Sequence, residues 1–546
     1  MFDDLTDEEL LSRGNPRVPE TVVARLVARG EHKRVAAGEK LYSVDDREYP
    51  FVYVRSGHVE VRAPDSHVIA HFEAGGFTGE LSLLLGQAAL VDCTAIAPSE
   101  LLVVSREDLV DLIQVDPVVG DLFVSAFAAR RQMLFRQHHS ALALVGPSGS
   151  PELLRLEQFA MRSRVPHRIV DSADPAAAEE VQKLGVAGPD IKVIVRGRHI
   201  LRNPSIADVA RSLGLEFVVD CGHPADVIIV GAGPAGLSAT VYAASEGLRT
   251  VLVDGIAIGG QAIASSRIEN FLGFPIGVSG SDLAFRAELQ AVKFGARIAV
   301  PRRVTRLHQT SVGGFHQLAL DDGTMLRGRS VVIATGARYR KLGLREEERF
   351  DGAGIFYAAT ELGALACKGK EAVVVGGGNS AGQAAMFLAG RGGRVRLVHR
   401  GRDLAQSMSQ YLIDRLYGSH NVVVETGSRP VELLGHSALE AVIIEDRTGR
   451  RITRDTCGLF VMIGADPSTD WLGGAVQLDE RRFVLTKSGQ PDLGAHSPFA
   501  TSLPGVFAVG DVRSGSVKRV ASAVGEGAQA ISAVHGYLAH LQRAVP

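Results

Sequence analysis

Short runs of alternating apolar and polar residues fill the first quarter of the chain and predict a small β-roll. The expected strands are 41–42, 51–54, 59–61 and 68–70, with turns at Gly38, Gly57, Gly75 and Gly76. Residues 108–128 then repeat apolar positions with a helical period, and Pro117 predicts a break within that helix. We therefore expect residues 1–137 to form a β-roll with helices.

Apolar runs and amphipathic segments alternate between residues 138 and 222. The expected strands are 141–145, 168–170 and 191–195, and the expected helices are 151–162, 176–184 and 205–213. This β-α-β-α-β-α order predicts a small α/β unit.

Two successions of apolar strand, glycine-rich turn and helix begin at Val227 and Val373. This arrangement predicts two Rossmann-like nucleotide-binding domains, the second inserted into the first. Residues 223–340 and 461–546 are expected to form the first domain, and residues 341–460 the second. The predicted fold class is therefore multidomain: an N-terminal β-roll with helices, a small α/β unit, and two nested Rossmann-like α/β domains.

Composition narrows the classes of function. Hydrophobic residues make up 46% of the chain and charged residues 22%, and the formal net charge is -2. These values predict a globular protein, and without a basic stripe we expect no nucleic-acid partner. The most apolar stretch, 227–242, is interrupted by glycines and a proline, so no membrane span is expected.

Cysteine usage favours a reducing compartment. Cys93, Cys221, Cys367 and Cys457 lie far apart and form no C-x-x-C pair. We expect no disulfide framework, no metal site and a cytoplasmic location, since the acidic N-terminus also lacks the order of a signal peptide.

The first glycine-rich turn has the spacing of a dinucleotide site. Gly231 makes the tight turn, Gly233 lets the backbone approach a diphosphate, and Gly236 permits close packing of helix on strand. Asp254 ends the next strand, where a carboxylate accepts hydrogen bonds from ribose hydroxyls. The turn also contains Pro234 and Ala235.

The second turn repeats this arrangement with a different charge. Gly376 and Gly378 lead into Asn379, Ser380 and Ala381. The following strand ends at His399 and Arg400, with Arg402 just beyond, where the first site has its acid. Arginine binds a 2′-phosphate that a carboxylate would repel, so NADPH is predicted rather than NADH. The alternative is that these arginines are solvated surface residues, since arginine is frequent throughout the chain.

Together, the two sites and several short motifs resemble the thioredoxin reductase family of flavoproteins over roughly the last 320 residues. The resemblance implies FAD contacts at Gly260, Gln261, Asn270, Ala334, Thr335, Gly336, Gly510, Asp511, Arg519, Val520 and Ala521. It also implies that Ile463 and Gly464 mark the return from the NADPH domain. FAD and NADPH are the expected cofactors, and a homodimer is the expected assembly.

One motif of that family is missing. Its Cys-x-x-Cys pair would fall at Ala358 and Glu361, and the acid that follows the pair is Leu362 here. Disulfide reduction needs a thiolate, which neither alanine nor glutamate provides. Cys367 is the nearest thiol. It is a candidate for a single redox cysteine, and the alternative, which is the more common case, is a buried structural cysteine.

The N-terminal half resembles two further families. Gly79, Glu80, Leu81 and Ser82 match the phosphate-binding cassette of cyclic-nucleotide-binding domains, but Ala89 stands where that family has the phosphate-binding arginine. Residues 138–222 resemble a thioredoxin- or glutaredoxin-type domain, and its expected active-site loop, 146–151, contains no cysteine. We expect weak or no binding of cyclic nucleotides and a redox-inactive α/β unit.

Three functions stay open from the sequence. The first is an NADPH-dependent flavin reductase whose acceptor is a quinone, a ferredoxin- or flavodoxin-like protein, or oxygen. The second is a disulfide reductase that uses Cys367 or the cysteines of a partner. The third is a sensor in which flavin state or ligand occupancy changes partner binding.

Overall fold

The structure is a computed structural model of the 546-residue chain. It describes residues 5–64, 66–136, 141–147, 150–183, 190–197, 199–215, 223–264, 268, 271–308, 314–350, 353–357, 359, 364, 367, 370–436, 438–486 and 497–544. Among these residues no helix is long and apolar enough to cross a bilayer.

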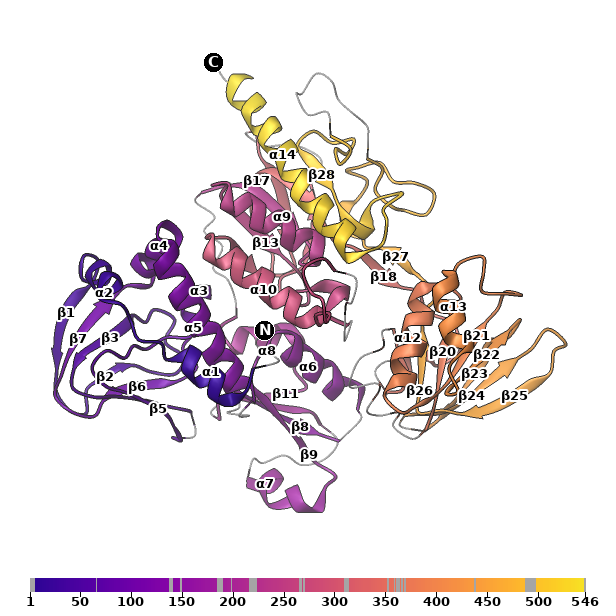
Figure 1. The fold of residues 1–546 in the computed structure, drawn as a ribbon, viewed down its shortest axis with the longest axis horizontal. Helices are drawn as coiled ribbons and strands as arrows, with labels where there is room; N and C mark the ends of the chain where they lie inside the picture. The colour runs from indigo at the N-terminus through magenta and orange to yellow at the C-terminus, as the bar shows by residue number, and fades with distance from the viewer. Residues whose placement is uncertain are drawn as a thin grey trace.

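The N-terminal residues fold into the roll domain, which lies at the left of Figure 1. Its two antiparallel sheets have the orders β1-β7-β3 and β2-β6-β4-β5. The strands are β1 (Glu31–Val35), β2 (Lys40–Tyr42), β3 (Phe51–Ser56), β4 (Val59–Arg62), β5 (Val68–Phe72), β6 (Asp92–Ala95) and β7 (Ser99–Val104). The helices are α1 (Asp7–Gly14), α2 (Glu20–Val27), α3 (Leu81–Leu85), α4 (Arg106–Val115) and α5 (Pro117–Arg136).

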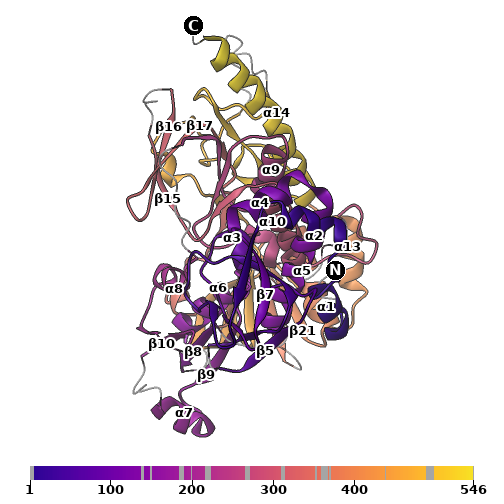
Figure 2. The same ribbon diagram turned by 90° about the vertical axis from the view of Figure 1, so that its left-hand side faces the viewer.

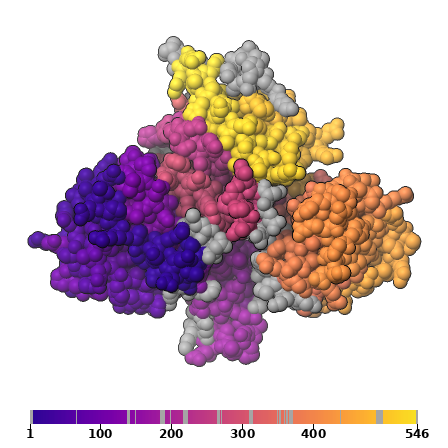
Figure 3. Space-filling model, viewed as in Figure 1, coloured from indigo at the N-terminus to yellow at the C-terminus, as the bar shows by residue number. Residues whose placement is uncertain are grey.

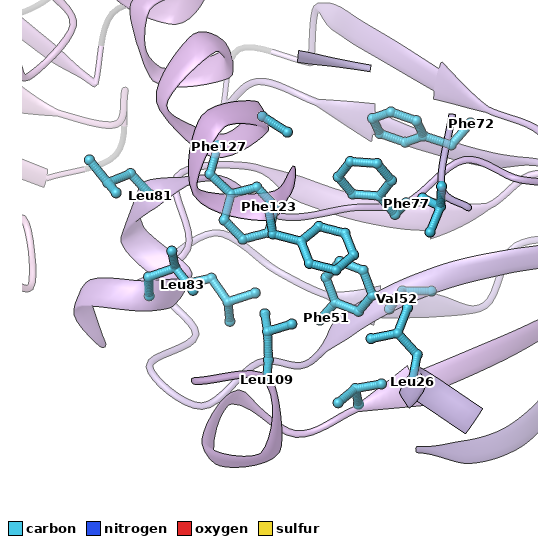
Figure 4. Close-up of a cluster of buried hydrophobic side chains, with 14 of the residues drawn as sticks. Leu26, Phe51, Val52, Phe72, Phe77, Leu81, Leu83, Leu109, Phe123 and Phe127 are labelled. Atoms are coloured by element: carbon cyan, nitrogen blue, oxygen red, sulfur yellow. The ribbon is translucent and has the colours of Figure 1, made fainter. Parts of the chain in front are cut away.

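The expected break at Pro117 is present between α4 and α5, and α5 runs along the core of the roll. Phe123 of α5 lies edge-on to Phe51 and Phe77, with ring centroids 5.0 and 5.2 Å apart. Figure 4 shows these rings with Phe127 and Leu81 in one apolar cluster.

The small α/β unit consists of β8 (Leu142–Gly146), α6 (Pro151–Arg162), β9 (His167–Asp171), a 3-10 turn (Pro175–Ala177), α7 (Ala178–Lys183), β10 (Lys192–Val195), β11 (His199–Arg202) and α8 (Ile206–Ser212). Its sheet order is β11-β10-β8-β9, with β9 parallel and β10 antiparallel to β8. Strand β11 was not expected, because the short hairpin after Arg196 has little apolar pattern. The thioredoxin-type assignment of this unit stays a prediction.

The first nucleotide domain has a mixed sheet of order β14-β13-β12-β17-β16-β15, and β28 also pairs with β17. Its strands are β12 (Ala225–Val230), β13 (Thr250–Val253), β14 (Arg297–Ala299), β15 (Val304–Leu307), β16 (His316–Leu320), β17 (Met325–Ile333) and β28 (Val506–Ala508). Its helices are α9 (Pro234–Ser245), α10 (Gly280–Lys293), α14 (Val520–Ala544) and the 3-10 turns η2 (Gly260–Ala264) and η6 (Gly510–Val512).

The second nucleotide domain, at the right of Figure 1, is inserted between β17 and β28. A parallel sheet of order β19-β26-β20-β21-β22 carries the site, and β23-β24-β25 form a second sheet. The elements are β19 (Ile355–Phe356), β20 (Glu371–Val375), α12 (Asn379–Gly390), β21 (Arg394–His399), α13 (Gln410–Tyr417), β22 (Val422–Thr426), β23 (Arg429–Gly435), β24 (Leu439–Glu445), β25 (Arg451–Asp455) and β26 (Gly458–Val461). The two-stranded ribbon of β18 (Ala337–Tyr339) and β27 (Ala465–Pro467) joins the two nucleotide domains.

Helix α10 connects the first nucleotide domain to the roll domain. Its Phe285, Leu289 and Val292 belong to the same apolar cluster as the core of the roll. Lys293 forms an ion pair of 2.6 Å with Asp121 of α5. In Figure 2 the roll domain faces the viewer, and Figure 3 shows the small α/β unit below the first nucleotide domain, between the two outer domains.

Candidate functional site

The first glycine-rich turn has the close approaches that the sequence predicted. Gly231 has a φ of 110°, and a Cβ at Gly236 would lie 1.8 Å from the carbonyl oxygen of Gly231. Nothing lies within 4 Å of a Cβ built at Gly233, which caps the N-terminus of α9 ahead of Pro234 and Ala235. The helix therefore directs its free N–H groups toward open space, as binding of a diphosphate requires.

Asp254, half-buried at the end of β13, holds this turn in place. Its carboxylate accepts hydrogen bonds from the backbone N–H groups of Ala232 and Ile256, both at 2.8 Å. Burial raises the pKa of Asp254 above its ordinary value, and these backbone bonds act in the opposite direction. Oδ1 also accepts the N–H of Ala257 at 3.3 Å, so the lone pair left for a ribose hydroxyl is on Oδ2.

Two more predicted FAD segments lie beside the turn. Gly260, with a φ of 55°, begins η2, and its Cβ would lie 2.8 Å from the Cα of Gly233. Gln261 donates a side-chain hydrogen bond to the carbonyl of Ala337. The carbonyl oxygen of Ala334 would lie 2.3 Å from a Cβ at Gly231, and Thr335 and Gly336 follow on the way to β18. Asn270 lies outside the described residues.

Asp511 supplies a carboxylate without a partner on the other side of the site. Among the described residues its side chain makes no hydrogen bond or ion pair, and burial raises its pKa above the ordinary value. Gly510 and Arg513 both bond to Glu526 instead. A half-buried acceptor of this kind fits a hydroxyl of the flavin side chain.

The segment after Asp511 begins the long helix α14. Arg519 lies just before this helix, and Val520 and Ala521 are its first residues. These three residues therefore lie at the N-terminal end of the helix, where backbone N–H groups have no partner within the helix. The resemblance implies that this segment contacts FAD.

The second turn repeats the first at the carboxyl ends of β20 and β21. The N–H of Gly376 donates to the carbonyl of Val398 at 3.0 Å, as that of Gly231 does to Val253 at 2.7 Å. Gly378 caps the N-terminus of α12, and Asn379, Ser380 and Ala381 open the helix. The structure thus brings the predicted NADPH residues of this turn together.

A histidine lies beside this turn, and two arginines follow it closely in the sequence. The imidazole of His399 lies between Gly377 and Gly401, where a Cβ on either glycine would come within about 2.3 Å of the ring. Burial lowers the pKa of His399. Arg400 and Arg402 are exposed and form no ion pair with the described residues, so both guanidinium groups are available to a phosphate.

The ribbon between the two domains lies close to both sites. Tyr339 of β18 stacks on Tyr357 with ring centroids 5.9 Å apart, and burial raises the pKa of Tyr339 to about 12. Ile463 and Gly464 precede β27, and the carbonyl of Gly464 accepts the N–H of Arg340 at 2.9 Å. Ala358, Glu361 and Leu362 lie outside the described residues.

The expectation that the cysteines stay unpaired is wrong for two of them. Cys367 and Cys457 form a disulfide with Cα atoms 5.1 Å apart. Parallel pairing of β20 with β26 places Cys457 beside Glu371. The backbone N–H of Cys457 donates a hydrogen bond to the carbonyl oxygen of Glu371 at 3.0 Å. The two residues are 90 positions apart in sequence, so only the strand register brings them together.

This disulfide lies at the end of the sheet opposite the nucleotide turn. Cys367 precedes the first residue of β20 and Cys457 precedes the first residue of β26, whereas Gly376 follows the last residue of β20. Because β20 has 5 residues, the disulfide and the glycine-rich turn lie about 15 Å apart along this strand. Cys367 is buried and forms this disulfide, so the expectation that it is a free redox thiol is wrong.

The predicted cyclic-nucleotide cassette is occupied by the chain itself. Arg131 of α5 donates to the Glu80 carboxylate at 2.9 Å and to Ser82 Oγ at 2.8 Å. A Cβ at Gly79 would lie 2.7 Å from the Phe127 ring, and Leu81 is buried in the core. The carboxylate that this family uses for a ribose hydroxyl therefore already has a partner.

The loop that would hold the phosphate is also covered. Ala89 is buried, and a Cβ at Gly214 of the small α/β unit would lie 2.8 Å from the Cβ of Ala88. Leu90 packs against the core of the same unit. The small α/β unit therefore covers this loop.

Cyclic AMP is therefore expected to produce no heat of binding with the flavin-loaded protein up to about millimolar concentration. The phosphate lacks its arginine, a charge-assisted bond worth about 1.5–3 kcal/mol, and Glu80 is engaged. Isothermal titration calorimetry checks this expectation. A dissociation constant in the micromolar range or tighter would contradict it.

Sequence reasoning missed Arg131, Cys457 and Tyr339. The signal for Arg131 was present, since an arginine on a helix rich in apolar residues needs a partner when that helix is buried. Cys457 and Tyr339 gave no such signal. Among the described residues no group of His, Cys, Asp and Glu could hold a metal ion.

Comparison with known proteins agrees with this geometry. Residues 225–527 match the family described as "Pyridine nucleotide-disulphide oxidoreductase", and residues 32–116 match the family described as "Cyclic nucleotide-binding domain". The matched ranges contain both glycine-rich turns and the cassette.

The named relatives match rather more than half of this chain. NADH dehydrogenase of Bacillus subtilis is 33% identical over 58% of this chain, and this match spans only 59% of that relative. Thioredoxin reductase of Streptomyces clavuligerus is 33% identical over 58% of this chain and 94% of its own. The crystal structure of Lactococcus lactis thioredoxin reductase in its FR conformation superposes with a TM-score of 0.52 at 29% identity, covering 58% of this chain and 99% of that one.

Proposed function

The chain belongs to the pyridine nucleotide-disulphide oxidoreductase family and is an FAD-dependent NAD(P)H oxidoreductase. From this premise we propose that NADPH reduces the flavin of the protein. We propose further that the electrons pass from the flavin to an acceptor other than a resident Cys-x-x-Cys pair. The observation that carries the proposal is the pairing of two unlike sites across one ribbon. One site offers the carboxylates Asp254 and Asp511, and the other offers the exposed cations Arg400 and Arg402.

The chain's own groups divide the work between the two cofactors. The first turn and the N-terminus of α9 bind the FAD diphosphate, while Asp254 accepts from its ribose. The second turn binds the diphosphate of NADPH, and the two arginines bind its 2′-phosphate. When bound, FAD supplies the hydride acceptor, and the protein orients the nicotinamide donor toward it.

The acceptor is proposed to be a small oxidant or a partner protein. A quinone, a ferredoxin- or flavodoxin-like protein and oxygen all accept electrons from a reduced flavin without a thiol. No pair of cysteines among the described residues lies at the nucleotide turns. An acceptor screen under anaerobic conditions identifies which of these oxidants restores the flavin absorbance.

NADPH is expected to reduce the flavin faster than NADH, and replacing Arg400 and Arg402 together by Ala should lower that preference by about tenfold or more, since each charge-assisted bond contributes about 1.5–3 kcal/mol. Anaerobic stopped-flow absorbance measures both rates. Arg394→Ala is the matched control, because this exposed arginine begins β21 whereas Arg400 follows its end.

The control variant should keep the wild-type preference. A double variant with an unchanged ratio of the two rates would place the 2′-phosphate elsewhere. A flavin that neither nucleotide reduces would contradict the proposed function itself.

A further inference from the structure

The turn after α6 attaches the small α/β unit to its neighbours. Arg164, with a φ of 47°, is buried in this turn. Its guanidinium donates to Gln132 of α5 at 2.5 Å and to Ser281 of α10 at 3.4 Å, and it lies over the Phe285 ring at 4.2 Å from the centroid. The end of α6 is therefore fixed on α10.

Helix α10 in turn packs directly on the FAD segment η2. A Cβ at Gly280 would lie 1.7 Å from the carbonyl oxygen of Ala262, and one at Gly259 would lie 2.9 Å from the Cβ of Ala284. The N–H of Gly259 donates to the carbonyl of Ala232 in the first glycine-rich turn at 2.8 Å. A single helix thus separates the Arg164 attachment from the diphosphate turn.

Arg162 is the last residue of α6, two positions before Arg164. Its side chain is half-buried and makes no hydrogen bond or ion pair with the described residues. It lies close enough to Asp254 and Tyr339 to interact with both electrostatically, and Tyr339 interacts in the same way with Asp511. Arg162 therefore lies among the groups of the FAD site.

A guanidinium in this position has no anion of its own. Burial lowers the pKa of Arg162, but arginine stays charged in proteins. The carboxylate of Asp254 already accepts backbone hydrogen bonds from Ala232, Ile256 and Ala257. A desolvated cation that lacks a bonded partner costs free energy, which an incoming anion recovers.

We propose that Arg162 of the small α/β unit completes the FAD site by supplying positive charge to the diphosphate of the cofactor. The inference rests on the proposed flavoprotein function. The diphosphate is the anionic part of FAD, and a guanidinium binds such oxygens through charge-assisted bonds. The small α/β unit, whose expected active-site loop has no cysteine, is then a component of the cofactor site.

The test compares FAD binding by apoprotein of the wild type, Arg162→Ala, Arg162→Lys and the control Arg155→Ala. Arg155 is on the same helix but is exposed. Quenching of flavin fluorescence gives each dissociation constant at low and high salt. We expect binding to Arg162→Ala to be weaker by about tenfold or more, binding to the lysine variant to be intermediate, and binding to the control to be unchanged.

The salt dependence distinguishes the loss of a phosphate contact from poor folding of the variant. Wild-type affinity should fall with salt more steeply than that of Arg162→Ala, because one phosphate contact is lost in the variant. Equal affinities and equal salt slopes for wild type, Arg162→Ala and Arg162→Lys would overturn the proposal. A wild type that binds FAD but is not reduced by NADPH would instead count against the proposed function and leave the Arg162 comparison intact.

Discussion

Thioredoxin is expected to undergo no measurable reduction by this protein, although NADPH bleaches the flavin. The route that the resemblance implies stores two electrons in a dithiol beside the flavin, and the sequence has Ala358 and Glu361 in place of its sulfurs. Neither side chain can attack a disulfide. The loss should amount to several orders of magnitude relative to a reductase with the pair, because an essential nucleophile is missing.

The Cys367–Cys457 disulfide does not replace the missing pair. It lies about 15 Å from the second nucleotide turn, at the opposite end of β20. Both sulfurs belong to the core region of the second domain, where Cys367 is 1% exposed. A thiolate of thioredoxin therefore cannot reach the Cys367 sulfur without opening of the domain.

The measurement is NADPH oxidation coupled to reduction of thioredoxin or of a small disulfide. The matched variant is Cys367→Ser with Cys457→Ser, which removes the disulfide and leaves both nucleotide turns unchanged. Wild-type turnover that the double variant lacks would identify this disulfide as a relay. Turnover that persists in the double variant would show that a partner's cysteines act directly on the flavin.

Local patterns predicted the geometry of the two glycine-rich turns, because that geometry depends on consecutive residues. Gly231, Gly236 and Gly376 all occupy positions where a Cβ would strike backbone oxygen, so the spacing of the glycines reports a physical constraint. The break between α4 and α5 was predictable for the same reason, since Pro117 cannot donate the helical hydrogen bond.

The remaining features depend on which distant segments meet, and the sequence has no local record of that. The register of β20 and β26 creates the disulfide, and α5 carries Arg131 back to a cassette that precedes it by 51 residues. Arg162 reaches the FAD site only because Arg164 attaches a separate unit to α10. Each of these contacts crosses between elements or domains, where residue spacing is uninformative.

Replacing Arg131 by Leu is expected to destabilise the roll domain by about 3–5 kcal/mol, because it leaves the Glu80 carboxylate buried without its counter-ion. The two side chains are 5% and 9% exposed, and their ion pair is 2.9 Å long. Thermal unfolding monitored by circular dichroism should show the transition of this domain at a clearly lower temperature.

The control is the double variant Arg131→Leu with Glu80→Leu, in which both charges are gone. Replacing a buried ion pair by apolar side chains is often neutral, so the double variant should regain most of the lost stability. That recovery would show that the buried charge of Glu80, and not the missing arginine contacts, causes the loss. A single variant as stable as the wild type would mean that water or another cation reaches Glu80, and the cassette would then be open to a ligand after all.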